Sequence, residues 1–307
     1  MRLPETDSVC LLETGTVCLP ETDSVSGLAQ TDSVTGPAET DSVTGPAQTD
    51  RVIRSWPAPE GLRTRGTIIV LPGRGEHGGV YERFGRRLSA DAYAVHALDV
   101  SAHDDAAAVR SAVAELAADA TVPVVLVGSD TGALHALALA VVSAVDGHAL
   151  DGLILAALPQ ADAVAALDGT GASDDWEWEL GARTTCPVHR ARLSEDETFV
   201  RGSLTAPIPS TLAAVLSDPG LELLKTPVLV LHGGSDPIAP VNHARELAAR
   251  LPRAELAVVD SARHDVLNDA THRTVAAQVV QWLERLRNGP ELTPLITVTT
   301  GEQLGIR

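Results

Sequence analysis

The chain has 307 residues, and its 44% hydrophobic content is enough for one large core or two modest ones. Its formal net charge of −18 argues against nucleic acid or an anionic membrane as a partner, because both need clustered positive charge on the protein; a neutral or cationic small substrate meets no such barrier. The longest apolar stretch is well short of the ~20 residues of a membrane-spanning helix, and the acidic N-terminus lacks the basic and apolar regions of a secretory signal.

The first fifty residues carry a nine-residue repeat. Thr-Asp-Ser-Val begins at Thr22, Thr31 and Thr40, and Thr49 continues the same phase. This segment is rich in Gly, Pro, Ser, Thr and acidic residues, and Val is almost its only bulky apolar residue. Such a segment cannot bury enough apolar surface to offset the conformational entropy that the chain loses on folding. The pattern therefore predicts a disordered segment over residues 1–51. A calcium-binding nonapeptide roll is disfavoured, because the Gly-Gly-x-Gly turn is missing.

From residue 52 onward, short apolar runs alternate with helical patterns. Strands are predicted at 67–71, 94–98, 123–127, 153–155, 227–231 and 256–259, and helices at 81–89, 105–118, 133–145, 241–251 and 272–287. Continuous apolar strands that alternate with helices indicate a parallel sheet covered on both faces, hence an α/β fold over residues 52–288. The alternation breaks once, between about 160 and 226, and residues 289–307 form either a tail or a weak edge strand near 295–299.

The three cysteines, Cys10, Cys18 and Cys186, match neither a disulfide framework nor a zinc site. We expect a reducing compartment, the cytoplasm, with no metal and no cofactor. The number of subunits stays open.

The most informative motif follows the run at 123–127. Residues 128–132 read Gly-Ser-Asp-Thr-Gly, which has the frame of a G-x-S-x-G nucleophile elbow. The two glycines leave room for a strained strand-to-helix turn that lifts the central side chain above the sheet. The central residue here is Asp130 instead of serine.

Three further motifs accompany the elbow in a fixed order. They are Leu71-Pro72-Gly73-Arg74-Gly75-Glu76-His77-Gly78-Gly79-Val80-Tyr81-Glu82, Leu231-His232-Gly233-Gly234-Ser235-Asp236-Pro237 and Ala262-Arg263-His264-Asp265-Val266-Leu267-Asn268-Asp269. With the elbow, they resemble the monoglyceride lipase, lysophospholipase and serine aminopeptidase S33 group of the α/β-hydrolase superfamily, over about residues 65–288. The chain departs from that group at Pro72 and Ser129, where histidine is usual, at Asp130, and in the loop after Asp99.

The resemblance implies an α/β-hydrolase fold and a catalytic set of Asp130, Asp236 and His264. Asp236 would hold the imidazole of His264 in one tautomer, and His264 would activate water or accept a proton. We expect Asp130 and Asp236 to reach opposite ring nitrogens of His264. The backbone amides of Arg74 and Thr131 would form an oxyanion hole.

Arg74 has a second possible role through its side chain. The guanidinium could neutralise Asp130 or recruit a carboxylate substrate, and a solvated loop position is the alternative.

In this superfamily an insertion such as 160–226 becomes a cap over the pocket. Trp176, Trp178 and Phe199 would then line the substrate cavity, unless they only attach the cap to the core.

Three functional hypotheses remain open. In the first, Asp130 attacks an sp³ carbon and forms an alkyl-enzyme ester that water hydrolyses. The supporting residues usual for that chemistry are absent, because Thr131 stands where a halide-binding tryptophan usually follows the nucleophile and both tyrosines precede the cap region. In the second, the protein is an esterase, lipase or peptidase that uses Ser129 or activated water. In the third, it binds a small apolar ligand or a partner without catalysis.

Overall fold

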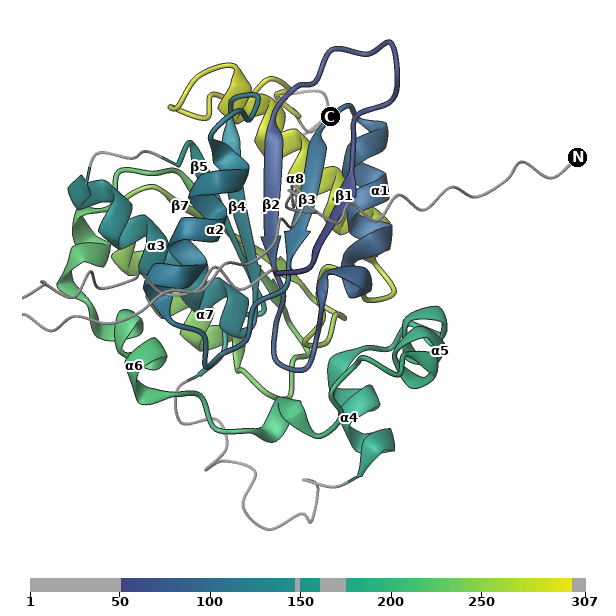
Figure 1. Cartoon of the computed structure of the whole chain (residues 1–307). Helices are drawn as coiled ribbons and strands as arrows, with labels where there is room; N and C mark the ends of the chain where they lie inside the picture. Colours follow the sequence, from purple (N-terminus) through teal and green to yellow (C-terminus); the bar gives the residue numbers. More distant parts are fainter. Residues whose placement is uncertain (1–50, 147–149, 161–174, 300–307) are drawn as a thin grey trace, which may run out of the picture. The chain divides into compact units, whose positions relative to one another are not determined.

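A seven-stranded sheet forms the centre of the computed structural model, which describes residues 51–146, 150–160 and 175–299 (Figure 1). The strands are β1 (Ile53–Trp56), β2 (Thr67–Leu71), β3 (Ala94–Leu98), β4 (Val124–Ser129), β5 (Gly152–Ala156), β6 (Val228–Gly233) and β7 (Ala254–Val259). Their order is β1-β3-β2-β4-β5-β6-β7, and every neighbouring pair is parallel except β1 with β3. The mostly parallel α/β fold predicted from the sequence is therefore confirmed.

Eight α-helices lie within the described residues. They are α1 (Glu82–Ala90), α2 (Ala106–Ala117), α3 (Thr131–Asp146), α4 (Trp176–Arg183), α5 (Pro187–Glu195), α6 (Ser210–Ala213), α7 (Val241–Arg250) and α8 (His272–Arg287). All five helices predicted from periodicity are present, and α3 begins two residues earlier than predicted because the elbow leads straight into it.

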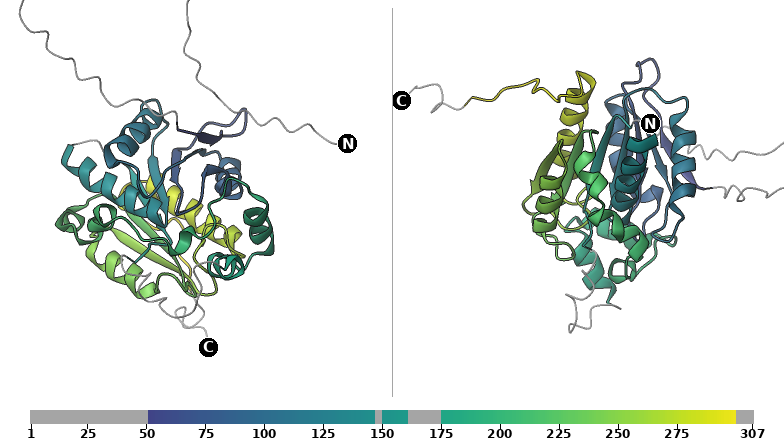
Figure 2. Two further views of the ribbon diagram at one scale, coloured as in Figure 1. Left: turned by 60° about the horizontal axis from the view of Figure 1, so that its bottom comes forward. Right: turned by 90° about the vertical axis from the view of Figure 1, so that its left-hand side faces the viewer.

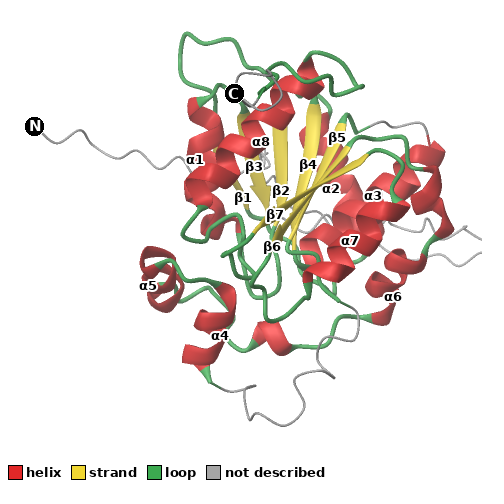
Figure 3. Ribbon diagram, turned by 180° about the vertical axis from the view of Figure 1, so that it is seen from behind, coloured by secondary structure: helices red, strands yellow, loops and turns green. Residues whose placement is uncertain are grey.

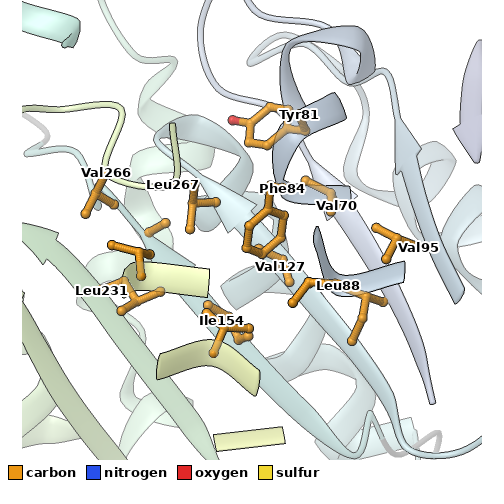
Figure 4. Packing of buried hydrophobic residues seen from close by; sticks show 14 of the residues in the cluster. Val70, Tyr81, Phe84, Leu88, Val95, Val127, Ile154, Leu231, Val266 and Leu267 are labelled. Carbon is orange, nitrogen blue, oxygen red and sulfur yellow. The ribbon is translucent and has the colours of Figure 1, made fainter. Parts of the chain in front are cut away.

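The core consists of two apolar layers, one on each face of the sheet. Alternate residues of β2 show the division, because side chains of a strand point to opposite faces. Ile68 and Val70 pack toward α1 and α8, together with Phe84, Leu88 and Trp282. Figure 4 shows part of this layer.

The opposite layer contains Ile69 and Leu71 from β2, and it packs against α2, α3 and α7. Figure 2 shows helices on both sides of the sheet. Strands covered on both faces explain the continuous apolar runs in the sequence.

The sheet changes direction of winding between β2 and β4. The chain passes from β2 to β3 on one side, and β4 then pairs with β2 on the other. In an open parallel sheet, ligands bind in the crevice outside the carboxyl ends of the strands at this kind of switch point. The loop after β2 and the elbow after β4 meet there.

The segment between β5 and β6 contains α4, α5 and α6 (Figure 3). It includes the described part of the predicted cap insertion, and α4 reaches the loop after β2 through a hydrogen bond from Arg183 to the carbonyl of Arg74.

Some sequence predictions fall partly or wholly outside the described residues. Residues 1–50, which hold almost the whole repeat segment, are among them. Residues 295–299 form no strand. Within the described chain, no helix combines the length and the apolar character that crossing a membrane requires.

Candidate active site

Asp130 sits at the apex of a tight turn between β4 and α3. Its backbone φ is +49°, a left-handed conformation that is uncommon for residues other than glycine. Two glycines allow the turn: a Cβ at Gly128 would lie 2.2 Å from the carbonyl oxygen of Gly132, and one at Gly132 would lie 2.1 Å from that of Leu71. The strain at Asp130 is what an elbow that presents its central side chain requires.

Replacing Gly132 with alanine should therefore destabilise the protein and displace the loop after β2. The new methyl group would lie 2.1–2.7 Å from backbone atoms of Leu71 and Pro72, which cannot rotate away as the end of a flexible side chain could. We expect a loss of about 1–3 kcal/mol in the free energy of unfolding. Urea unfolding monitored by circular dichroism measures it. Gly181→Ala in α4 is the matched control, because its Cβ would meet only Arg190 Nη1 at 3.8 Å. Equal stability of the two variants would contradict the crowded elbow.

His264 and Asp236 form a buried pair beside the elbow. Asp236 follows β6, and its Oδ2 lies 2.8 Å from Nδ1 of His264. The other oxygen of Asp236 accepts hydrogen bonds from the backbone amides of Ile238 and Ala239 at 2.8 and 3.2 Å. The carboxylate is thus held in place by its own turn, and it orients the imidazole ring.

The second ring nitrogen of His264 faces Asp130. Nε2 lies 3.3 Å from Oδ1 of Asp130, which is an ion-pair distance without the alignment of a hydrogen bond. The expected arrangement, with Asp130 and Asp236 at opposite nitrogens, is what the structure contains. His264, Asp130 and Asp236 are all buried, with 1%, 2% and 9% of their surface exposed.

Two carboxylates beside one imidazole favour its charged form. Burial opposes the imidazolium, but the charge of Asp236 and the contacts with Asp130 outweigh that effect and raise the pKa of His264 to about 10. At neutral pH the ring therefore carries a proton as long as Asp130 is ionised.

The side chain of Arg74 closes on Asp130. Nε donates to Oδ2 at 2.8 Å and Nη2 donates to Oδ1 at 2.9 Å, which makes the two-point contact typical of arginine and carboxylate. Burial would raise the pKa of Asp130, but the charge of Arg74 and the contacts with His264 and Arg74 hold it well below its usual range. Arg74 is 6% exposed, so the solvated position considered from the sequence is wrong.

The backbone amide of Arg74 donates to the same carboxylate. The amide nitrogen lies 2.9 Å from Oδ2 of Asp130, so one of the two predicted oxyanion donors points at the elbow residue. Thr131, the other predicted donor, is the first residue of α3. The Arg74 guanidinium also reaches across to the insertion, where Nη1 donates to the carbonyl of Ala206 at 2.8 Å.

Ser129, the alternative nucleophile, lies at the end of β4. Its hydroxyl interacts with the phenol of Tyr81, and this contact works against the burial that raises the pKa of Tyr81. The elbow apex next to His264 is occupied by Asp130.

The three predicted cap aromatics pack within the insertion and against the core. The rings of Trp176 and Phe199 are tilted with centroids 5.6 Å apart, and Arg201 lies 4.7 Å from the centroid of the Trp176 ring. Trp178 packs against Ala182, Leu204 and Ile238.

Sequence reasoning missed a buried ionic cluster behind the site, which we call the Arg183 cluster: Arg183, Glu76, Glu179 and Asp265. Arg183 Nη2 donates to Glu179 at 2.9 Å, and Nη1 lies 3.4 Å from Asp265 and 4.0 Å from Glu76. Glu76 and Asp265 stand in the recognised motifs, but nothing marks Arg183. Because Arg183 also holds the carbonyl of Arg74, the cluster ties the loop after β2 to the insertion.

Glu76 makes this cluster sensitive to pH. Burial and the charge of Asp265 raise its pKa to about 7, although Arg183, Tyr81 and the amide of Gly73 favour the carboxylate. A group with a raised pKa in the folded state binds its proton more readily there, so it reduces stability as the pH rises between its unfolded and folded values.

We therefore expect the wild type to lose stability relative to a Glu76→Gln variant as the pH rises from about 4.5 to about 7, by at most about 1.4 kcal/mol per pH unit. Glutamine keeps an acceptor for Gly73 and Tyr81 without the charge. Urea unfolding of both proteins across this range measures the difference. A difference that is constant with pH would contradict the account.

The residues described hold no group of three or more His, Cys, Asp and Glu side chains that could bind a metal ion.

Comparison with known proteins places the chain in a family. A model described as "Alpha/beta hydrolase family" matches residues 68–278, while no curated protein shows significant sequence similarity. Among solved structures, a soluble variant of monoglyceride lipase from Saccharomyces cerevisiae is similar with a TM-score of 0.61 and 18% identity, over 77% of this chain and 92% of the other.

Two further structures have a similar fold. A monoacylglycerol lipase from Paleococcus ferrophilus gives a TM-score of 0.60 at 20% identity, over 77% of this chain and 99% of that one. A thermophilic esterase from Thermogutta terrifontis gives 0.54 at 20% identity, over 77% and 94%. At these identities the likeness concerns the fold.

Proposed function

Because the chain belongs to the α/β-hydrolase family, we propose that this hydrolase uses the carboxylate of Asp130 as its nucleophile in place of a serine hydroxyl. The carboxylate attacks a saturated carbon that carries a leaving group, such as a halide or the oxygen of an epoxide. Attack on a carboxylic ester is disfavoured, because it would give an anhydride. The lipases and esterases of similar fold therefore do not define the bond that this protein cleaves.

The observation that carries the proposal is that the two carboxylate oxygens of Asp130 have different neighbours. Oδ2 accepts the backbone amide of Arg74, and Oδ1 lies beside Nε2 of His264. Oδ2 is thus held at an oxyanion donor, and Oδ1 can attack once Nη2 of Arg74 releases it. The carbonyl carbon between the two oxygens then stays within reach of water that His264 activates.

In the first step, Oδ1 forms a bond to the substrate carbon and the leaving group departs with the bonding electron pair. The product is an ester of Asp130. Esterification removes the negative charge at Asp130 that helps to keep His264 protonated, so the pKa of His264 falls from about 10. The histidine then releases its proton and becomes a base only after the ester has formed.

In the second step, His264 takes a proton from water, and the hydroxide attacks the carbonyl carbon of the Asp130 ester. The charge that develops on Oδ2 is stabilised by the amide of Arg74. The bond from the carbonyl carbon to Oδ1 breaks, and the product alcohol leaves with Oδ1 and the proton from His264. Asp236 orients the ring and stabilises its charged form throughout.

A second candidate function is favoured by the ion pair between Arg74 and Asp130. A carboxylate engaged at two points by a buried guanidinium is a weak nucleophile, as expected of a member of the family that binds a ligand without reaction. An acyl-transfer mechanism at Ser129 has less support, because Ser129 contacts Tyr81.

A panel of haloalkanoates, haloalkanes, epoxides, p-nitrophenyl esters and monoacylglycerols separates these functions. We expect turnover in the halide or epoxide group, with halide release or diol formation, and none in the ester group. Turnover of esters together with fluorophosphonate labelling of Ser129 would replace the proposal by acyl transfer. No turnover anywhere, with ligand affinity unchanged in Asp130→Asn and His264→Ala, would favour the binding protein.

A further inference from the structure

We propose that Arg74 selects substrates that carry a carboxylate next to the reacting carbon, and that this carboxylate takes the place of Asp130 on the guanidinium. The inference rests on the proposed function, because it names the substrate class of the same site. Suitable substrates are short acids with a leaving group on the carbon beside the carboxylate, such as 2-halo acids, or with an epoxide at that carbon.

The resting site contains a buried charged group, the Arg74 guanidinium, that a neutral substrate cannot pair with. The Arg74 guanidinium is almost wholly buried and directs Nε and Nη2 at Asp130 and Nη1 at the carbonyl of Ala206. Asp130 cannot attack while both its oxygens accept hydrogen bonds from this side chain. Its release by a neutral substrate would leave a buried cation without a partner, which is strongly unfavourable.

A substrate carboxylate removes that difficulty because it offers the guanidinium the same two-point contact. One anion replaces another on Arg74, and Asp130 is freed when a substrate binds. The protein has a large negative charge overall, but the local positive charges of Arg74 and of protonated His264 face this position.

The two functions of Arg74 lie in different parts of the residue. Its backbone amide holds Oδ2 of Asp130, and its side chain holds the carboxylate of Asp130 or, in the complex, that of the substrate. Rotation of the side chain therefore leaves the nucleophile oriented. Arg183 Nη2 donates to the backbone carbonyl of Arg74, which keeps the loop and its amide in place.

The short contacts also limit how far the carboxylate of the acid can lie from its reacting carbon. Arg74 and Asp130 are in direct hydrogen-bond contact, at 2.8 and 2.9 Å. A carboxylate bound to the same guanidinium therefore places its adjacent carbon close to Oδ1, and a carboxylate far from the reacting carbon does not. With 2-chloropropionate, the Asp130 oxygen bonds to carbon 2, chloride leaves with the electron pair, and hydrolysis of the ester gives lactate and one proton.

The test compares 2-chloropropionate with 2-chloropropionamide, which has the same shape without the charge. We expect wild-type kcat/KM to be about 100-fold or more higher for the acid. In Arg74→Gln this preference should be lost, because the variant has no cation for the acid and Asp130 is free for the amide. Arg87→Gln on the exposed side of α1 removes the same charge elsewhere and should keep the preference.

Equal turnover of acid and amide by the wild type would overturn the inference and leave the Asp130 mechanism intact. Binding of the unreactive pair propionate and propionamide, measured by calorimetry, provides a readout that does not depend on turnover. Propionate should bind the wild type at least about 10-fold more tightly than propionamide, more tightly still in Asp130→Asn, and not measurably in Arg74→Gln.

If these binding results are obtained but neither chloro compound reacts, the carboxylate site is supported and the proposed function fails. Equal binding of propionate and propionamide, or weaker binding of propionate in Asp130→Asn, would overturn the inference.

Discussion

A His264→Gln variant should complete the first step of the reaction and stop at the ester. Glutamine retains a hydrogen-bond donor for Asp236, but it cannot take a proton from water, so the Asp130 ester has no base to hydrolyse it. We expect release of one equivalent of leaving group per protein, followed by a rate about 10²–10⁴-fold below the wild type. Rapid-quench measurement of the leaving group and the mass of the intact protein together detect the trapped ester.

The location of the adduct makes this result specific. Peptide mapping should place the added mass on Asp130. His135→Gln should show full multiple turnover, because Nε2 of His135 in α3 pairs with the carbonyl of Ser101 and not with a residue of the catalytic set. Sustained turnover by His264→Gln, or an adduct on Ser129, would contradict the role given to His264.

The second large effect is expected for Asp130→Asn. An amide has neither the charge nor the nucleophilicity of a carboxylate, so turnover should fall by about 10⁴-fold or more and no ester should form. The same change leaves the guanidinium of Arg74 buried without its anionic partner, which should cost about 3–5 kcal/mol of stability. Steady-state kinetics and urea unfolding measure the two effects.

A double variant separates the loss of chemistry from the loss of stability. Asp130→Asn combined with Arg74→Gln removes both charges, so the stability should return toward that of the wild type while turnover stays absent. Recovery of activity in the double variant, or full activity in Asp130→Asn, would contradict a nucleophilic Asp130.

Much of the fold could be predicted from the sequence because the sheet is covered on both faces. Strands such as β2, β4 and β6 are wholly buried, and their apolar runs stand out against the amphipathic helices between them. The strand β1 was missed. Its sequence Ile-Arg-Ser-Trp is mostly exposed and pairs only with β3, so it has neither a continuous run nor a clear alternation.

The site was predictable in its main-chain framework and less so in its side-chain contacts. Asp130, Asp236 and His264 each follow a strand in the order of a known motif set, so their meeting at one edge of the sheet follows from topology. The pairing of Arg74 with Asp130, across 56 positions, was one of several alternatives open for that side chain. The contact of Arg183 with Asp265, across 82 positions, had no signal in the sequence. Such contacts depend on rotamers within a closed interior, which no local pattern encodes.

The central claim is that Asp130 forms a covalent ester with the substrate, and a single turnover in water enriched in heavy oxygen tests it most directly. Hydrolysis at the carbonyl carbon of the ester places the water oxygen on the enzyme, so the first product should be unlabelled and the peptide that contains Asp130 should carry heavy oxygen. Label in the first product with an unlabelled Asp130 would contradict the claim, because water would then have attacked the substrate itself.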